Sequence, residues 1–126
     1  MDNRTLGSEY EKKARHFLEE QGVKVITMNY HFHKAGEIDI IYKDFVNENG
    51  NIVNYLCFGE VKYRRNNYSG NAVEAVDYNK IKKISRTAYG YMKQNKISPD
   101  YPMRFDVIAI DRGSITWIKN AFYPVL

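Results

Sequence analysis

The spacing of apolar residues predicts two helices. Residues 8–21 carry apolar side chains at helical intervals, and Ser8 with Glu11 fits a capping box at the helix start. Gly22 would end this helix in a left-handed conformation. A second helix is predicted from its cap at Asp77 to about Gln94. Its buried side would consist of four apolar residues, Ile81, Ile84, Ala88 and Met92.

Alternation of apolar and polar residues predicts five strands around the second helix. They cover residues 23–28, 36–43, 52–63, 103–111 and 115–119. Residues 44–50 include the turn formers Asn47, Asn49 and Gly50, so the second and third strands are expected to form a hairpin. The predicted order is α-β-β-β-α-β-β, which corresponds to an α/β fold with a central mixed sheet flanked by helices. The whole of 1–126 is expected to form a single domain.

Composition excludes several classes of protein. Of the 126 residues, 44% are hydrophobic and 27% are charged, which is typical of a folded globular chain. No apolar run approaches the roughly 18 residues of a membrane span, and the polar start of the chain does not resemble a signal peptide. The one cysteine, Cys57, allows neither an internal disulfide nor zinc ligation by paired cysteines. We therefore expect a cytoplasmic protein without membrane contact.

Basic residues are concentrated between Lys62 and Lys96. This stretch holds nine of the 19 Lys and Arg residues but only two of the 15 acidic residues. Such a block indicates a polyanionic partner, and nucleic acid is the first candidate. The alternative is a solvated helix face with no partner.

Candidate chemistry lies on the second and third predicted strands. Glu37 and Asp39 share one strand face, and Glu60 and Lys62 share a face of the next strand. A hairpin would bring Asp39 close to Glu60 and Lys62. Carboxylates that converge repel one another unless a cation joins them, and Mg²⁺ or Mn²⁺ prefers oxygen ligands. Lys62 would then orient an attacking water or stabilise the charge that develops on a phosphodiester.

The alternative interpretation of this pattern is a surface ion pair of little energetic value. Residues 56–62 (LCFGEVK) argue against it, since the run is apolar on both faces, as in a central strand. Charged side chains at such positions are costly unless they are paired or ligated. Gly59 within this run would leave a gap or permit close approach of backbone.

Residues 36–41 (GEIDII) and 58–64 (FGEVKYR) resemble the YraN family of bacterial proteins, also called UPF0102. That family resembles the PD-(D/E)xK nucleases and, among them, the archaeal Holliday-junction resolvases. The likeness covers nearly the whole chain. It extends to Gly7-Ser8-Glu9 with Ala14 and Phe17-Leu18, to residues 72–76 leading to Lys80, to residues 104–110, and to residues 120–122.

This resemblance implies a restriction-endonuclease-like core with a metal site. Asp39 and Glu60 would hold Mg²⁺ or Mn²⁺, and Lys62 would be the catalytic lysine. Glu9 on the first helix would complete the site, although a plain surface acid is an equal interpretation. Glu37 would support the ligands, or else be an exposed strand residue.

The implied function is endonucleolytic hydrolysis of DNA, selective for structure such as branches or flaps rather than for sequence. Backbone contacts would come from six basic residues, Arg64, Arg65, Lys80, Lys82, Lys83 and Arg86. Tyr63 and Tyr68 would stack on bases. A homodimer is also implied, because a junction offers two related strands. The alternatives are a non-catalytic nucleic-acid-binding module and a protein partner within a DNA-processing complex.

Other polar residues are interpreted as structural. His16, His31 and His33 form no metal-binding pattern with Cys57 and are expected at the surface. Asp106 lies in an apolar strand and is expected to pair with Arg104 or Lys119.

Overall fold

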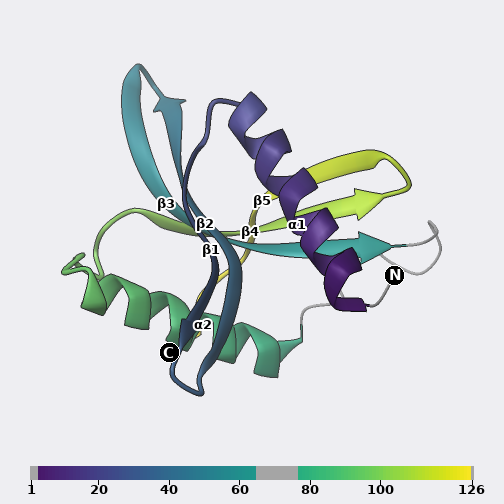
Figure 1. Cartoon of the computed structure of the whole chain (residues 1–126). Coiled ribbons are helices and arrows are strands. Elements are labelled where there is room, and N and C mark those ends of the chain that lie inside the picture. The colour runs from purple at the N-terminus through teal and green to yellow at the C-terminus, as the bar shows by residue number, and fades with distance from the viewer. Residues whose placement is uncertain (1–2, 65–76, 126) are drawn as a thin grey trace.

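The computed structural model describes residues 3–64 and 77–125, with side chains from Ser8 to Tyr63 and from Asp77 to Val125 (Figure 1). The elements are α1 (Asn3–Glu20), β1 (Lys24–Phe32), β2 (Gly36–Glu48), β3 (Asn51–Arg64), α2 (Tyr78–Gln94), β4 (Met103–Asp111) and β5 (Ser114–Phe122). The predicted element order is confirmed.

The five strands form one mixed sheet in the order β1-β2-β3-β4-β5. Only β3 and β4 are parallel, and α2 is the crossover between them; the other neighbours are antiparallel. The predicted mixed sheet is therefore confirmed, with β3 as its central strand.

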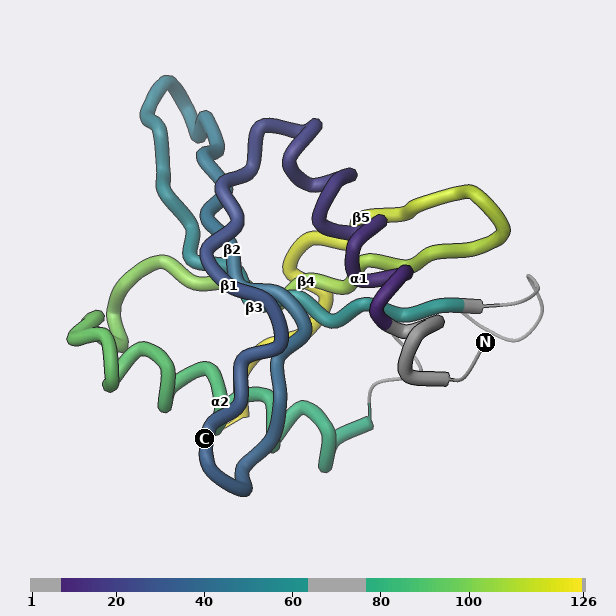
Figure 2. The backbone as a smooth tube through the Cα atoms, viewed as in Figure 1, coloured from purple at the N-terminus to yellow at the C-terminus, as the bar shows by residue number. Residues whose placement is uncertain are grey.

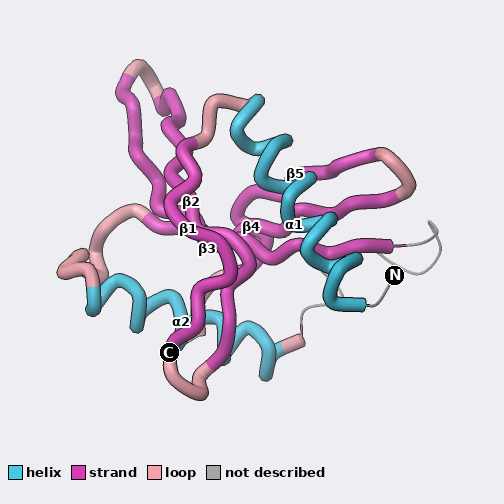
Figure 3. Tube along the Cα trace, viewed as in Figure 1, coloured by secondary structure: helices cyan, strands magenta, loops and turns pink. Residues whose placement is uncertain are grey.

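One helix covers each face of the sheet (Figure 3). Ala14 and Leu18 of α1 are fully buried in one hydrophobic core, which includes Ile40 and Ile108 of the sheet. Ile84, Ala88 and Met92 of α2 belong to a second core on the other face, and their predicted burial is confirmed. Ile81, the fourth residue of that stripe, is partly buried against the same core. Each helix therefore contributes its apolar stripe to a separate layer.

The helix ends only partly follow the prediction. The capping box at Ser8 is wrong, because α1 already begins at Asn3 and Ser8 lies inside it. Gly22 has φ +88°, as a left-handed helix terminator requires. The predicted cap of α2 is confirmed, since an Asp77 carboxylate oxygen accepts from the backbone N–H of Lys80 at 2.8 Å.

The β2–β3 hairpin is longer than predicted. Residues 44–48, expected to form a turn, continue β2, and pairing extends to Glu48 and Asn51. The turn is confined to Asn49 and Gly50, whose φ angles of +53° and +87° suit a tight hairpin. As Figure 2 shows, the far end of this hairpin projects beyond the rest of the sheet.

The predicted alternation of β2 is wrong around Asp39. Ile38 belongs to the core under α2, whereas Ile40 belongs to the core under α1, although the two are only two residues apart. On the neighbouring strand, Asn29 has φ +52°. Tyr30 pairs with Ile38 and Met28 pairs with Ile40 in the same register, but the pairing is interrupted between them, at Asn29 and Asp39. This irregularity gives Asp39 a direction that simple alternation does not predict.

The close approach at Gly59 is made by side chains of the neighbouring strands, and not by backbone as one of the two predicted alternatives had it. A Cβ atom at this position would lie 2.9 Å from side-chain atoms of both Ile108 and Ile40. Such contacts are closer than packed carbon atoms tolerate. Gly59 therefore allows the core to close directly beneath β3, one residue before Glu60.

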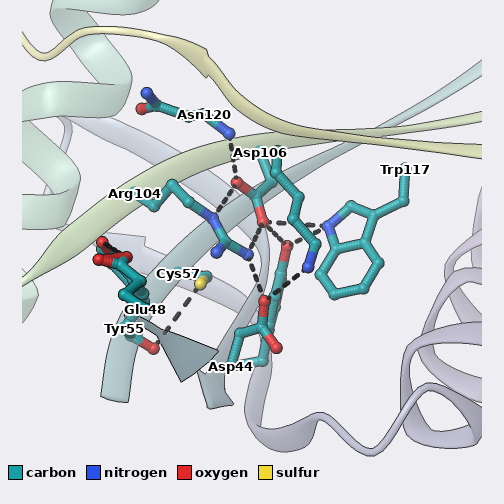
Figure 4. Close-up of polar contacts among 10 residues, drawn as sticks. Asp44, Glu48, Tyr55, Cys57, Arg104, Asp106, Trp117 and Asn120 are labelled. Atoms are coloured by element: carbon teal, nitrogen blue, oxygen red, sulfur yellow. Dashed lines mark hydrogen bonds and ion pairs between the residues drawn. The ribbon is translucent and has the colours of Figure 1, made fainter. Parts of the chain in front are cut away.

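A buried polar network joins β2, β4 and β5 on the face covered by α1 (Figure 4). Asp106 is fully buried, and both of its carboxylate oxygens accept hydrogen bonds from Arg104 at 2.8 Å. The indole N–H of Trp117 and the backbone N–H of Asn120 donate to the same carboxylate, as does the hydroxyl of Tyr42. The predicted pairing of Asp106 with Arg104 is confirmed.

The same network extends to Asp44. Its carboxylate accepts from Arg104 at 2.9 Å and lies 3.1 Å from the ammonium of Lys119. Two carboxylates therefore face two cations, which offsets the cost of burying charge. This cluster is satisfied by its own members, so it is interpreted as part of the scaffold.

Candidate active site

Asp39 is fixed by the strand that carries the other predicted site residues. Its Oδ2 atom accepts a hydrogen bond from the backbone N–H of Val61 at 2.8 Å. Val61 lies between Glu60 and Lys62, which project from β3 on the face opposite Val61. The structure therefore brings Asp39, Glu60 and Lys62 together at one place on the sheet.

Glu60 is buried and forms an ion pair with Lys80. Its side chain is 7% exposed, and its Oε2 atom lies 3.6 Å from the Nζ atom of Lys80, at the start of α2. The pair borders a cavity of about 270 Å³. The cavity is lined by Gly36, Glu37, Asp39, Glu60, Lys80, Lys83 and Ile84.

Asp39 and Glu60 both lie in surroundings that disfavour their charged forms. Burial raises the pKa of Asp39 to about 6, and the neighbouring charges of Glu11 and Glu37 add to the effect. Burial also raises the pKa of Glu60 to about 7, with a further contribution from Asp39. The backbone N–H of Val61 and the cation of Lys80 oppose these shifts without cancelling them. Removal from water is thus the main reason that both carboxyl groups disfavour their charged forms, and the negative charge of neighbouring carboxylates adds to it.

Lys62 is half-buried, and burial lowers its pKa. Lys80 lowers it further, because the two side chains are close enough to share a hydrogen bond and two ammonium groups repel. Burial also disfavours the charged form of Lys80, but its hydrogen bond with Lys62 and the charges of Glu60 and Asp39 outweigh this, so its pKa is raised. The arrangement favours a proton on Lys80 over a proton on Lys62.

A third part of the site comes from α1. Carboxylate oxygens of Glu11, Glu37 and Asp39 all lie within 4.8 Å of one another. With its amide nitrogen turned toward these groups, Asn29 donates to Glu37 at 3.0 Å and to Glu11 at 2.9 Å. Three oxygen donors at this separation form a donor set that suits a hard divalent cation.

Glu11, and not Glu9, is the acid that α1 contributes. Glu9 is exposed and forms an ion pair with Lys12 at 3.7 Å. The sequence did contain a signal for Glu11, which precedes the buried Ala14 and Leu18 by three and seven residues. This spacing puts Glu11 on the helix face that contacts the sheet, whereas Glu9 lies off it.

The other predicted residues divide into three groups. Lys82, Lys83 and Arg86 are exposed on α2, and Lys83 also lines the cavity. Tyr63 stacks on Tyr10 of α1 with ring centroids 3.8 Å apart, so it lies on the opposite face of the sheet from Lys62. Arg65, Tyr68 and the side chain of Arg64 lie outside the described residues.

The histidines are exposed, as predicted. His31 lies 3.8 Å from Glu37 at the edge of the acidic cluster, and His16 contacts Glu20 on α1. Among the described residues, neither helix has the length and apolar character needed to cross a lipid bilayer.

Comparison with known proteins identifies relatives along almost the entire chain. Residues 10–110 match the model of a family described as "Uncharacterised protein family UPF0102". A UPF0102 protein of Vibrio parahaemolyticus serotype O3:K6 is 40% identical over 120 residues, which cover 94% of this chain and 92% of the relative. A UPF0102 protein of Lachnoclostridium phytofermentans is 38% identical over 122 residues, covering 97% and 96%. The chain therefore belongs to the UPF0102 family.

Proposed function

We propose that this protein hydrolyses DNA phosphodiester bonds with Mg²⁺ or Mn²⁺ as its cofactor. The observation that carries the proposal is the convergence of Asp39 with Glu11 and Glu37, next to Glu60 and Lys62. Two carboxyl groups with raised pKa values, Asp39 and Glu60, beside a lysine with a lowered pKa are typical of a functional site.

The residues present fit a divalent ion. Asp39 and Glu60 would be its ligands, and Glu11 or Glu37 would complete the oxygen set. The raised pKa values of Asp39 and Glu60 support this assignment, because bound positive charge would relieve the burial of two carboxylates. When bound, the ion would lower the pKa of a coordinated water and offset charge on the phosphodiester.

Lys62 is the residue proposed to act on the reacting groups. It projects from the same face of β3 as Glu60, and burial together with the nearby Lys80 lowers its pKa. It would orient the attacking water, or donate to the phosphate oxygen on which negative charge develops. Its position on a central strand fixes it more firmly than a loop would.

The exposed basic side of α2 would hold the nucleic-acid backbone. Lys82, Lys83 and Arg86 lie along this helix, which begins at the cavity. Contacts of this kind neutralise phosphates without reading bases, so binding would be salt-dependent and largely independent of sequence. Preference for branched or flapped DNA is part of the proposal by analogy with the resolvases.

A cleavage assay tests the proposal. Purified protein would be incubated with end-labelled branched, flapped and single-stranded DNA, with Mn²⁺ and with EDTA. We expect cleavage only with Mn²⁺, and a loss of about 100-fold or more in Asp39→Ala and Lys62→Ala. Binding without cleavage in Mg²⁺ and Mn²⁺ would instead support a nucleic-acid-binding module.

A further inference from the structure

Lys80 differs from the other basic residues of α2 in what it contacts. Its Nζ atom lies 3.6 Å from Oε2 of Glu60, and its side chain is 38% exposed. Lys83 lines the same cavity, but among the described residues it forms no ion pair with an acid. Lys80 therefore contacts a carboxylate of the site directly, whereas Lys83 lines the cavity without such a contact in the described residues.

The position of Lys80 is unfavourable for α2 alone. It lies in the first turn, where its backbone N–H is bound by the Asp77 cap at 2.8 Å, and the first turn contains no acidic residue. The N-terminal end of a helix carries partial positive charge, so a lysine there is normally disfavoured. The attraction of the buried Glu60 carboxylate offsets this cost.

The two lysines reach the site from different elements. Lys62 projects from the central strand and is half-buried, while Lys80 approaches from a helix end with part of its side chain in solvent. At 3.6 Å its contact with Glu60 is longer than the roughly 2.7–2.9 Å of a tight charge-assisted hydrogen bond. A cation that binds the Glu60 carboxylate can replace this contact, because the buried charge then keeps a positive partner.

We propose that Lys80 is a displaceable counter-ion of Glu60, which it holds in the metal-free protein and leaves for a substrate phosphate when a divalent cation binds. This inference rests on the proposed function. Its physical reason is that a divalent cation at Glu60 would repel Lys80 as well as compete with it. A phosphate oxygen beside the ion would offer Lys80 a new anionic partner.

Two consequences follow from this exchange. Lys80 opposes metal binding in the absence of nucleic acid, because the cation must first break its contact with Glu60. Nucleic acid relieves that opposition by binding Lys80, so metal and nucleic acid strengthen each other's binding.

The first consequence can be measured by calorimetric titration of Mn²⁺ alone into wild type, Lys80→Met and Lys83→Met. The Lys83→Met variant is the matched control, since it removes the same charge from the same cavity without touching the Glu60 contact. We expect Lys80→Met to bind Mn²⁺ about tenfold more tightly than wild type, and Lys83→Met to change the affinity less than about threefold. Lys80→Gln serves as a second variant should Lys80→Met fail to give a native circular dichroism spectrum.

The second consequence requires binding of a short single-stranded oligonucleotide, with and without Ca²⁺, which also takes oxygen ligands. We expect Ca²⁺ to tighten oligonucleotide binding in wild type and in Lys83→Met, and to do so about tenfold less in Lys80→Met. If Lys80→Met and Lys83→Met bind Mn²⁺ with equal affinity, the role proposed for Lys80 is wrong and the proposed function still stands. Absence of Mn²⁺ binding in every form would overturn both.

Discussion

The backbone N–H of Val61 donates to the carboxylate of Asp39 at 2.8 Å, which ties β2 to β3 between Glu60 and Lys62. This hydrogen bond crosses the irregular part of β2, where the strand changes the core that its side chains face. The site is thus built around a backbone donor that is itself part of the central strand.

The contribution of Asp39 and Glu60 to the stability of the metal-free protein should decrease as pH rises from about 4 to 8. Folding raises the pKa values of Asp39 and Glu60 to about 6 and about 7, so the folded state binds more protons than the unfolded state across this range. Their contribution is therefore most favourable at low pH and decreases as pH rises through the folded values. Asp39→Asn and Glu60→Gln should each reduce this loss of unfolding free energy by about 1–3 kcal/mol. Urea unfolding in EDTA at about pH 5 and pH 8 measures the effect.

The exposed Asp100→Asn is the control for this experiment and should retain the wild-type dependence. An unchanged pH dependence in both site variants would contradict the buried, uncompensated state assigned to these carboxyl groups.

Glu11→Gln should weaken Mn²⁺ binding by about tenfold or more and reduce cleavage by at least as much, because it removes a charge from the cluster with Glu37 and Asp39. Glu9→Gln is a matched substitution on the same helix, and it should change neither quantity, since Glu9 pairs with Lys12. Calorimetry and the DNA cleavage assay measure the two effects. The reverse ranking of the two variants would show that Glu9 is the acid that completes the site.

Asp106→Asn should destabilise the protein by about 3–5 kcal/mol. Asp106 is as deeply buried as any residue of the sheet, and it accepts from Arg104, Trp117, Tyr42 and the backbone of Asn120. An amide supplies one acceptor oxygen in place of two and leaves the charge of Arg104 less compensated. In urea unfolding at about pH 8 in EDTA, Asp106→Asn should therefore lower the free energy of unfolding, whereas Asp39→Asn should raise it. A loss below 1 kcal/mol would mean that the network is not a main source of stability.

Removing two cations from α2 should weaken DNA binding in a salt-dependent manner. The Lys82→Ala/Arg86→Ala double variant should lower the slope of log affinity against log salt by about 2, since each phosphate contact contributes about 0.9. Lys12→Ala/Lys13→Ala removes the same charge from the exposed side of α1 and should leave the slope unchanged. Fluorescence anisotropy titrations at salt concentrations between about 50 and 200 mM would measure both slopes, because phosphate contacts weaken strongly over that range. Equal slopes for both double variants would place the nucleic acid elsewhere.

The sequence was sufficient for the parts of this molecule that depend on local pattern. Strand periodicity alone puts Glu60 and Lys62 on one face, and the structure places them there. Glu11 required more, because its direction depends on how Ala14 and Leu18 rotate α1 onto the sheet. The predicted capping box instead assigned the Glu11 side chain to the helix start, whereas α1 begins at Asn3.

Two other features depend on long-range geometry. The positive φ of Asn29 and the irregular pairing beside it decide where Asp39 points, and neither follows from alternation. Lys80 was predicted only as a contact to the nucleic-acid backbone, because its approach to Glu60 depends on the crossover from β3 to the start of α2.

Tyr63 was assigned to nucleic acid from its basic neighbours, although its strand position directs it to Tyr10.

The buried network of Asp106 and Arg104 uses no residue of the carboxylate cavity and lies on the opposite face of the sheet. A substitution of Lys62 can therefore abolish catalysis while the network of Asp106 and Arg104 still stabilises the fold. A Lys62→Ala protein should remain intact and hold its nucleic acid uncut, so cross-linking it inside cells and sequencing what it retains offers a route to the natural target.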